Sequence, residues 1–274
     1  MTTSRRLTGP VQWYGGKGQL APRLLKLLPE GEGYCEPYGG AAALLFAKEP
    51  SRFEVYNDVN GDLVNLFRAL RDPLRFERLC GNVETTLYAR GEFIEALNAL
   101  ESSDDPDERA WAFYVAMNQA FGGVKPTPGR WSRSTSPAKA RRDVSAAVSR
   151  WLSRLDNLPM WHERLSTVQI DQRDAIDIIR TYDDPDMVFY VDPPYVRETR
   201  NGDAYAFEVD DPHHERLIDA LLSIEGKALV SGYNHPIYEP LERGGWEVHD
   251  LSFVARGQLT DKSKSRIERA WVKL

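Results

Sequence analysis

One short segment strongly restricts the fold, because an apolar run in it ends abruptly at two prolines. Met187 to Val191 is rich in Val and aromatic residues, which predicts a strand buried on both faces. The strand must end before Pro193 and Pro194, since proline cannot donate to a neighbouring strand. Asp192 and Tyr195 flank the prolines. We therefore expect a carboxylate, rigid carbonyls and an aromatic ring together at the carboxyl end of a strand, the edge of an open α/β sheet where ligands bind.

Such an arrangement suits methylation of an exocyclic amino group on a nucleobase. That nitrogen is a weak nucleophile because its lone pair is delocalised into the ring. If Asp192 and the Pro193 carbonyl each accept one N–H, the nitrogen becomes pyramidal and its lone pair available. Tyr195 would stack on the base, which must leave the duplex to reach the site. Asp192, Pro193, Pro194 and Tyr195 resemble the (Asp/Asn/Ser)-Pro-Pro-(Tyr/Phe) motif of amino-methyltransferases that use S-adenosylmethionine, and the Asp form points to adenine N6.

Strand-like and helix-like segments alternate at both ends of the chain, which predicts an α/β fold with a parallel sheet. We expect strands at 33–36, 53–56, 167–170, 187–191 and 227–231, with a strand-rich tail to 274. The helices expected between them are 18–28, 41–48, 60–70, 174–181 and 212–223. The middle of the chain shows only helices, at 73–89, 92–100, 107–119 and 138–156, and a Gly/Pro/Ser-rich loop at 122–137.

This pattern predicts a Rossmann-like catalytic domain made of two separate pieces of the chain, 1–70 and 166–274. Residues 71–165 form the helical insert between them, and a chain of 274 residues can hold this arrangement.

A glycine turn near the start has the features of a cofactor site. Glu36-Pro37-Tyr38-Gly39-Gly40 joins an expected strand to an expected helix, so its backbone could approach a ligand and the helix amino end would offer free N–H groups. Asp58 follows the next strand, where a carboxylate can accept both hydroxyls of an adenosine ribose. An ordinary turn and a helix cap are the structural alternatives. The spacing of the two features favours the cofactor interpretation.

Together, these motifs resemble those of the Dam-like and phage-type D12 class of N6-adenine DNA methyltransferases, in the same order along the chain. In that family Lys17, in the segment 11–17, lies near the methionine end of the cofactor, and Asp174 lies near its adenine. The resemblance implies S-adenosylmethionine as cofactor and a set of residues that bind it: Trp13, Lys17, Glu36, Pro37, Tyr38, Gly39, Gly40, Asp58, Asp174 and Asp192. Residues 117–123 do not closely match the region that reads GATC in Dam, so no recognition sequence follows.

A basic stretch marks the expected contact with DNA. The chain carries a net charge of −6, yet eight basic residues between Lys125 and Arg154 stand against the single acid Asp143. Such a local excess on an acidic protein indicates a directed contact with a polyanion. The expected DNA-binding residues, including one beside the target pocket, are Lys125, Arg130, Trp131, Arg133, Arg141, Arg142 and Tyr233. A solvated helix with scattered charges is the alternative for 138–155.

The cysteines, the apolar runs and two adjacent histidines give further expectations. Cys35 and Cys80 lack metal-ligand spacing, so we expect no metal site. The chain shows no apolar run long enough for a membrane span and no signal-peptide pattern, so we expect a cytoplasmic protein. His213 and His214 are expected as surface residues at a helix start.

Other functions compete with adenine methylation as explanations of single motifs. Gly16 to Ala21 fits the dinucleotide pattern GxGxxA, but an isolated match is weak. An N4-cytosine methyltransferase is the nearest alternative, although Ser is commoner there in place of Asp192. A catalytically silent, methyltransferase-derived DNA-binding protein would be favoured by loss of Asp192 or Tyr195, and both are intact. The sequence leaves open an RNA substrate, the oligomeric state and an accompanying restriction nuclease.

Overall fold

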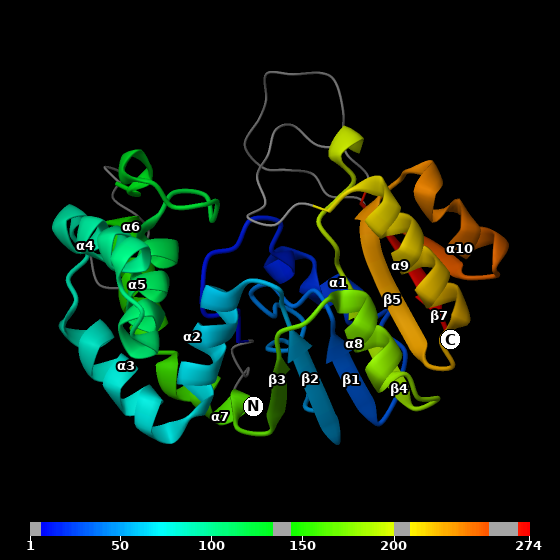
Figure 1. Cartoon of the computed structure of the whole chain (residues 1–274), viewed down its shortest axis with the longest axis horizontal. Helices are drawn as coiled ribbons and strands as arrows, with labels where there is room; N and C mark the ends of the chain where they lie inside the picture. Colours follow the sequence, from blue (N-terminus) through cyan, green and yellow to red (C-terminus); the bar gives the residue numbers. More distant parts are fainter. Residues whose placement is uncertain (1–6, 134–143, 200–208, 252–267) are drawn as a thin grey trace.

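The computed structural model describes residues 7–133, 144–199, 209–251 and 268–274, and within these residues it contains a seven-stranded sheet (Figure 1). The strands are β1 Gly33–Glu36, β2 Phe53–Asn57, β3 Val168–Asp171, β4 Met187–Val191, β5 Lys227–Tyr233, β6 Glu247–Leu251 and β7 Glu268–Lys273. Their order across the sheet is β3-β2-β1-β4-β5-β7-β6. Strands β1 to β5 are parallel to one another, whereas β7 runs antiparallel to both β5 and β6. The predicted Rossmann-like fold is confirmed.

The strand order reverses at β1: β2 and β3 lie on one side of it, and β4 and β5 lie on the other. Gly33 is in register with Phe53 of β2 on one side and with Met187 of β4 on the other. Ligands bind outside the carboxyl ends of the strands at such a point, because the loops there diverge and leave a crevice. The glycine turn after β1 and the Asp192 turn after β4 therefore meet at one place.

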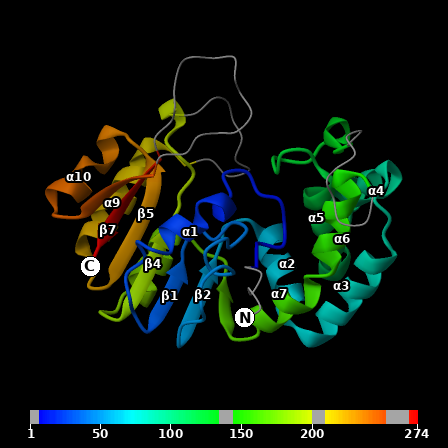
Figure 2. The ribbon, with the colours of Figure 1, turned by 180° about the vertical axis from the view of Figure 1, so that it is seen from behind.

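Both faces of the sheet are covered, which explains why β1 and β4 are buried along their whole length. On one face Cys35, Val55 and Phe189 pack with helices α8 (Ala175–Tyr182) and α9 (Asp211–Ser223). On the other, Tyr34 and Tyr56 pack with the amino-terminal segment and α2 (Gly61–Arg71). Figure 1 shows the first face and Figure 2 the second.

Beyond α2, next to β3, five helices form a separate block (Figures 1 and 2). They are α3 Pro73–Thr85, α4 Arg90–Ser102, α5 Pro106–Gln119, α6 Ala146–Leu155 and α7 Leu158–Leu165. Asp72 and Asp105 cap α3 and α5, each followed by a proline at the first helical position. The block shares one continuous core with the α2 face of the sheet, so the division at residues 71 and 165 stays a prediction.

The structure corrects several expected helices. Residues 41–48 form irregular turns because Ala42 has a φ of 54° and the Leu45 N–H donates to the Glu36 carboxylate, 2.7 Å away. The helix expected at 18–28 is reduced to a 3-10 turn at Lys17–Gln19 and the single turn α1, Ala21–Leu24. Helix α6 begins at Ala146, capped by Ser145, and residues 138–143 lie outside the described part of the chain. Helices α7 and α10 (Glu239–Arg243) were not predicted.

Candidate active site

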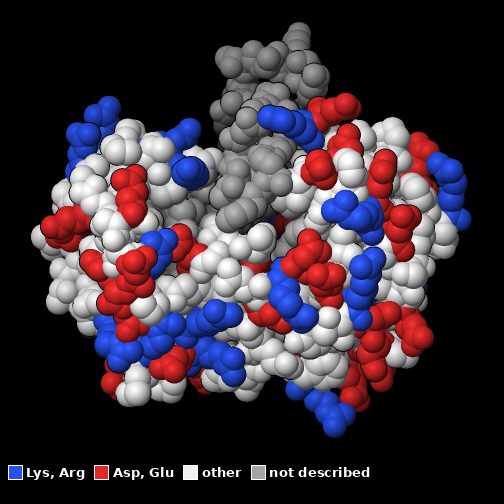
Figure 3. Space-filling view, in the orientation of Figure 1, with Lys and Arg blue, Asp and Glu red and all other residues white. Residues whose placement is uncertain are grey.

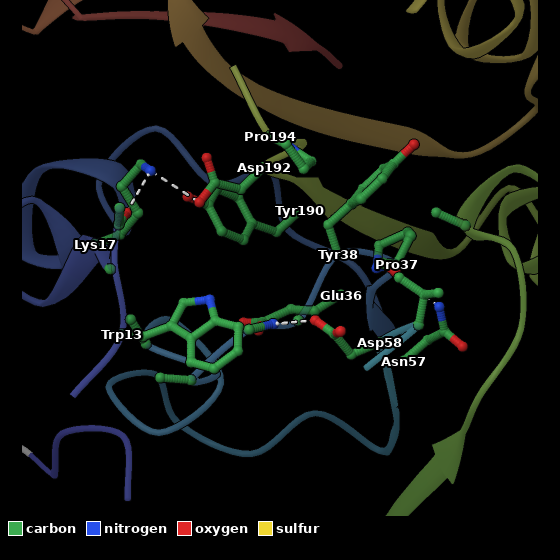
Figure 4. Close-up of a pocket in the computed structure, with 18 of the residues that line it drawn as sticks. Trp13, Lys17, Glu36, Pro37, Tyr38, Asn57, Asp58, Tyr190, Asp192 and Pro194 are labelled. Carbon is green, nitrogen blue, oxygen red and sulfur yellow. Dashed lines mark hydrogen bonds and ion pairs between the residues drawn. The ribbon is translucent and has the colours of Figure 1, made fainter. Parts of the chain in front are cut away.

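A cavity of about 390 Å³ opens at the carboxyl ends of β1, β2 and β4 (Figure 4). It brings together every residue predicted to bind the cofactor: Trp13, Lys17, Glu36, Pro37, Tyr38, Gly39, Gly40, Asp58, Asp174 and Asp192. Pro194 also lines it, whereas Pro193 and Tyr195 are buried beside it. The sequence therefore indicated which residues come together, although the spacing of the motifs did not predict the shape of the cavity.

Asp192 is held from two sides. The Lys17 Nζ donates to its Oδ2 at 2.8 Å and the Ser231 hydroxyl donates to its Oδ1 at 2.8 Å. Lys17 also donates to the Gly15 carbonyl at 2.8 Å, which fixes the ammonium in the amino-terminal loop. The Asp192 side chain keeps 18 % of its surface exposed. A fixed, partly accessible carboxylate can still accept a hydrogen bond from a ligand.

Glu36 forms part of the buried wall of the cavity. Its Oε1 accepts from the Tyr34 hydroxyl and from the Leu45 N–H, each at 2.7 Å. Burial raises the pKa of Glu36 to about 7, and the two hydrogen bonds oppose this shift only in part. The carboxyl group thus holds the turn at 41–48 in its irregular path.

Asp58 ties the end of β2 to the glycine turn. Its Oδ2 accepts from the Gly40 N–H and its Oδ1 from the Asn60 N–H, both at 2.8 Å. Burial raises the pKa of Asp58, although these backbone N–H groups counteract it. Asn60, not Asp58, caps α2. The helix-cap explanation for Asp58 is therefore wrong, and its carboxylate lines the cavity instead.

Tyr195 is enclosed by three neighbours. Its hydroxyl donates to the Glu268 carboxylate, its ring meets the Tyr233 ring edge-on at 4.7 Å, and the Lys17 Nζ lies 4.7 Å from its ring centre. The hydroxyl stays protonated because burial raises the pKa of Tyr195 well above its usual range. The ring orientation is thus set by its surroundings.

Polar and aromatic residues that sequence reasoning did not assign to the cofactor also line the cavity, among them Asn57, Arg173, Tyr190 and His213. The Asn57 side chain donates to the Pro37 and Arg173 carbonyls, at 2.8 and 3.0 Å, so it joins the loops after β1 and β3. The His213 Nε2 lies 2.7 Å from the Tyr38 hydroxyl. Asn57 directly precedes Asp58, which is the one signal that could have revealed it.

Two residues flanking the cavity have roles in the fold as well. Asp174 caps α8 by accepting from the Ile176 N–H at 2.9 Å, so its carboxylate stays at the cavity. His214, in α9, is fully buried, with its ring edge-on to that of Tyr238. The expectation of a surface position is therefore wrong for His214, whereas His213 is partly exposed and lines the cavity.

The loop between α5 and α6 carries most of the predicted DNA contacts. An antiparallel bridge between Ala120 and Trp131 closes it into a hairpin, from which Phe121, Lys125, Arg130 and Arg133 are exposed. Figure 3 shows basic side chains along the upper rim of the helical block, in the region where Figure 1 places this loop. Trp131 is only partly exposed, since its ring packs on Tyr88 and its Nε1 donates to Gln119.

The other basic residues of the stretch differ in their surroundings, and Arg150 on α6 is exposed. Arg141 and Arg142 lie outside the described residues. Arg154 turns inward, where it donates to the Gly9 carbonyl at 3.2 Å and burial lowers its pKa. Its guanidinium therefore does not extend from the helix into solvent as the exposed Arg130 side chain does.

The strand order, the cavity at the switch point and the fixed Asp192 turn define a Rossmann-like methyltransferase. A family model, D12 class N6 adenine-specific DNA methyltransferase, matches residues 13–237. The chain belongs to this family.

Named relatives agree over nearly the full length. A type II methyltransferase, M1.LlaDCHI, of Lactococcus lactis subsp. cremoris is 24% identical over 94% of this chain and 92% of its own. A DNA adenine methylase of Serratia marcescens is 23% identical over 91% and 90%, and one of Haemophilus influenzae is 24% identical over 81% and 76%.

The family membership decides among the functions weighed from sequence. The protein is a DNA adenine methyltransferase, so it carries a methyl group from a donor to adenine N6 in DNA. The N4-cytosine, dinucleotide-binding and catalytically silent alternatives are not supported. Among the described helices, none has the length and apolar character that a membrane crossing requires.

Proposed function

We propose that the cavity binds S-adenosylmethionine and that the Asp192 turn presents the target adenine to it. The observation that carries this proposal is the pairing of Lys17 with Asp192, which places the end of the cavity directly against the Asp-Pro-Pro-Tyr turn (Figure 4). When bound there, the cofactor supplies an activated methyl group on a sulfonium.

The residues present fit this cofactor. The cavity volume of about 390 Å³ lies in the range of small-molecule sites. The Asp58 carboxylate lies on its wall, beside the glycine turn, where it can accept ribose hydroxyls. Trp13 and Tyr38 offer aromatic surface, and Figure 4 shows both rings beside the cavity. An apolar site with a few fixed polar groups suits a nucleoside with a charged tail.

Asp192 would accept one N–H of the adenine amino group and the Pro193 carbonyl would accept the other. Because Lys17 and Ser231 already hold the carboxylate, little reorganisation is needed when the base arrives. The fixed Tyr195 ring would offer a surface for stacking on the flipped base. Tyr233 would contribute to the same pocket through its edge contact with Tyr195.

We propose double-stranded DNA as the substrate and residues 71–165 as the target-recognition part. The exposed Lys125, Arg130 and Arg133 on the hairpin support contacts to phosphates, and the exposed Phe121 provides an apolar group beside them. Arg141 and Arg142 remain in the proposal on their sequence position alone. The type II methyltransferase of Lactococcus lactis supports a search for a restriction nuclease that acts with this protein.

Incubation with labelled S-adenosylmethionine and mixed-sequence duplex DNA, followed by nucleoside analysis, tests the proposal. We expect label in N6-methyladenine. Label confined to cytosine, or no transfer although calorimetry shows the cofactor bound, would contradict it. Single-stranded DNA and RNA of the same sequences separate the substrate classes, and we expect duplex DNA to give the highest rate.

A further inference from the structure

We propose that Glu268 is a positioning residue for methyl transfer: it holds the Tyr195 ring in the orientation that a flipped adenine meets. The inference rests on the roles proposed above for Asp192 and Tyr195, and it adds a residue from the last strand of the sheet to the site.

The strand order of the sheet places Glu268 beside the site. It is the first residue of β7, and it pairs in register with Tyr233, the last residue of β5. A parallel strand in this position would bring its final residue to this edge, whereas the antiparallel β7 brings its first. Glu268 therefore lies at the carboxyl edge of the parallel strands, beside the Asp192 turn and far along the chain from it.

The burial of Glu268 needs an explanation, since only 8 % of the residue is exposed. Burial of a carboxylate is unfavourable unless charged or hydrogen-bonding partners surround it. The partners that the structure gives Glu268 belong to the site: the Tyr195 hydroxyl donates to it, and the Lys17 Nζ lies 3.6 Å away. Lys17 thus lies between two carboxylates, closer to Asp192 than to Glu268.

The contact acts on the far end of the Tyr195 ring. The hydroxyl is bonded to Glu268, while Tyr233 touches the ring edge-on and Lys17 lies over its centre. Because its raised pKa keeps the phenol protonated, the hydroxyl is always able to donate. Without the acceptor, the ring would keep its two side contacts but lose the bond that fixes its far end.

The test compares Glu268→Ala, Glu268→Gln and Tyr195→Phe under single-turnover conditions. Loss of a hydrogen bond to a charged group should lower the methyl-transfer rate of Glu268→Ala about ten- to a hundredfold. Glu268→Gln keeps an oxygen that can accept from Tyr195, so its rate should return to within about threefold of the wild type, an estimate based on a near-normal hydrogen bond. Tyr195→Phe should match Glu268→Ala, and combining the two should lower the rate no further.

Three further measurements separate positioning from a general loss of structure. Cofactor affinity by calorimetry and the melting temperature should stay close to wild type in Glu268→Gln, and Glu247→Gln, an exposed carboxylate on β6, is the control for charge loss. With 2-aminopurine at the target position, Glu268→Ala should give brighter fluorescence than the wild type, because stacking on Tyr195 quenches it.

Clear outcomes would overturn the inference. A fully active Glu268→Ala would remove Glu268 from the reaction. Equal losses in Glu268→Ala and Glu268→Gln, with Tyr195→Phe at full rate, would mean that charge matters and ring position does not. If Asp192→Ala is dead while Glu268→Ala is fully active, only this inference fails; if Asp192→Ala keeps its turnover, the proposed function itself is wrong.

Discussion

The Lys17 ammonium lies 2.8 Å from Asp192 Oδ2, so a residue near the start of the chain pairs with one in the Asp-Pro-Pro-Tyr turn. The contact joins the amino-terminal loop, which lines the cavity proposed for the cofactor, to the turn expected to hold the target base. The expected methyl donor and the expected target base therefore meet at this ion pair.

Asp192→Ala should abolish methyl transfer while leaving cofactor affinity within a fewfold of wild type. Its proposed partner is the target amino group, and loss of a fixed charged acceptor at the reacting centre costs roughly a thousandfold in rate. Single-turnover kinetics and calorimetry on the same protein check both parts. Ser231→Ala, which keeps the carboxylate but removes one of its donors, should lose much less activity. Loss of cofactor binding in Asp192→Ala would show that Asp192 contacts the cofactor and not the target amino group.

Asp58→Ala should show the opposite pattern. A ribose contact is made equally in the ground and transition states, so its loss should weaken cofactor affinity with little effect on the rate at saturation. The variant also frees the Gly40 N–H, which adds to the loss. Asn60→Ala, which removes the α2 cap but leaves Asp58 in place, controls for damage to this region. Unchanged cofactor affinity in Asp58→Ala would exclude the ribose contact.

Neutralising the hairpin should weaken DNA binding and flatten its salt dependence. Each lost phosphate contact removes about 0.9 from the slope of log affinity against log salt, so Arg130→Gln with Arg133→Gln should reduce it by about two. Cofactor affinity should not change. The double variant Arg180→Gln and Arg243→Gln, on exposed parts of α8 and α10, provides a control of equal charge. If the two double variants show equal slopes of log affinity against log salt, the DNA does not contact the hairpin.

His214 should make the folded protein less stable at acidic pH. Burial first, and then the neighbouring His213, lower the pKa of His214 to about 4. Because the unfolded chain takes up the proton more readily, stability is complete above about pH 6.5 and is lost as the pH falls towards 4. From pH 7 to pH 5 this group should account for a loss of about 2 kcal/mol in the free energy of unfolding.

Urea titrations of wild type and His214→Leu at pH 7 and pH 5 measure this effect as the difference between the two proteins. The comparison cancels other groups, including Glu36, whose raised pKa changes stability in the opposite direction. His249→Leu, partly exposed on β6, is the control for loss of an imidazole. If wild type and His214→Leu lose equal stability between the two pH values, His214 is not the group responsible.

Strands β1, β2, β4 and β5 were predictable because each is a short and mostly buried run, and β1 and β4 are buried along their whole length. Strands β6 and β7 were expected only as a strand-rich tail, and β6 is largely exposed. The turn at 41–48 was not. Its alanines and leucines favour a helix, yet the buried Glu36 carboxyl group accepts the Leu45 N–H and the chain takes another path. Local propensity could not reveal this because the competing acceptor is a side chain nine residues away.

The site residues, too, were predictable in part and unpredictable in part. Motif order predicted that ten residues meet at one site, and all ten line one cavity, since each lies at the end of a strand of the same sheet, in the turn after it or in the amino-terminal loop. Their role in binding the cofactor stays a prediction. It did not separate Arg154, which is partly buried and bonded to the Gly9 carbonyl, from Arg130, which is exposed, because charge alone carries no information about direction. Glu268 was also missed, since its partners lie on other strands and no local pattern marks it.

The order of strands in the sheet has a consequence for how the protein is made. While the ribosome synthesises the chain, β1 emerges early, but its partner β4 emerges only after the whole helical block, and β7 emerges last of the strands. The helices of the block can form from local contacts, whereas the sheet requires residues distant in sequence. A nascent chain shorter than 268 residues therefore lacks the carboxylate that accepts from the Tyr195 hydroxyl, and this buried contact can form only after translation has passed the start of β7.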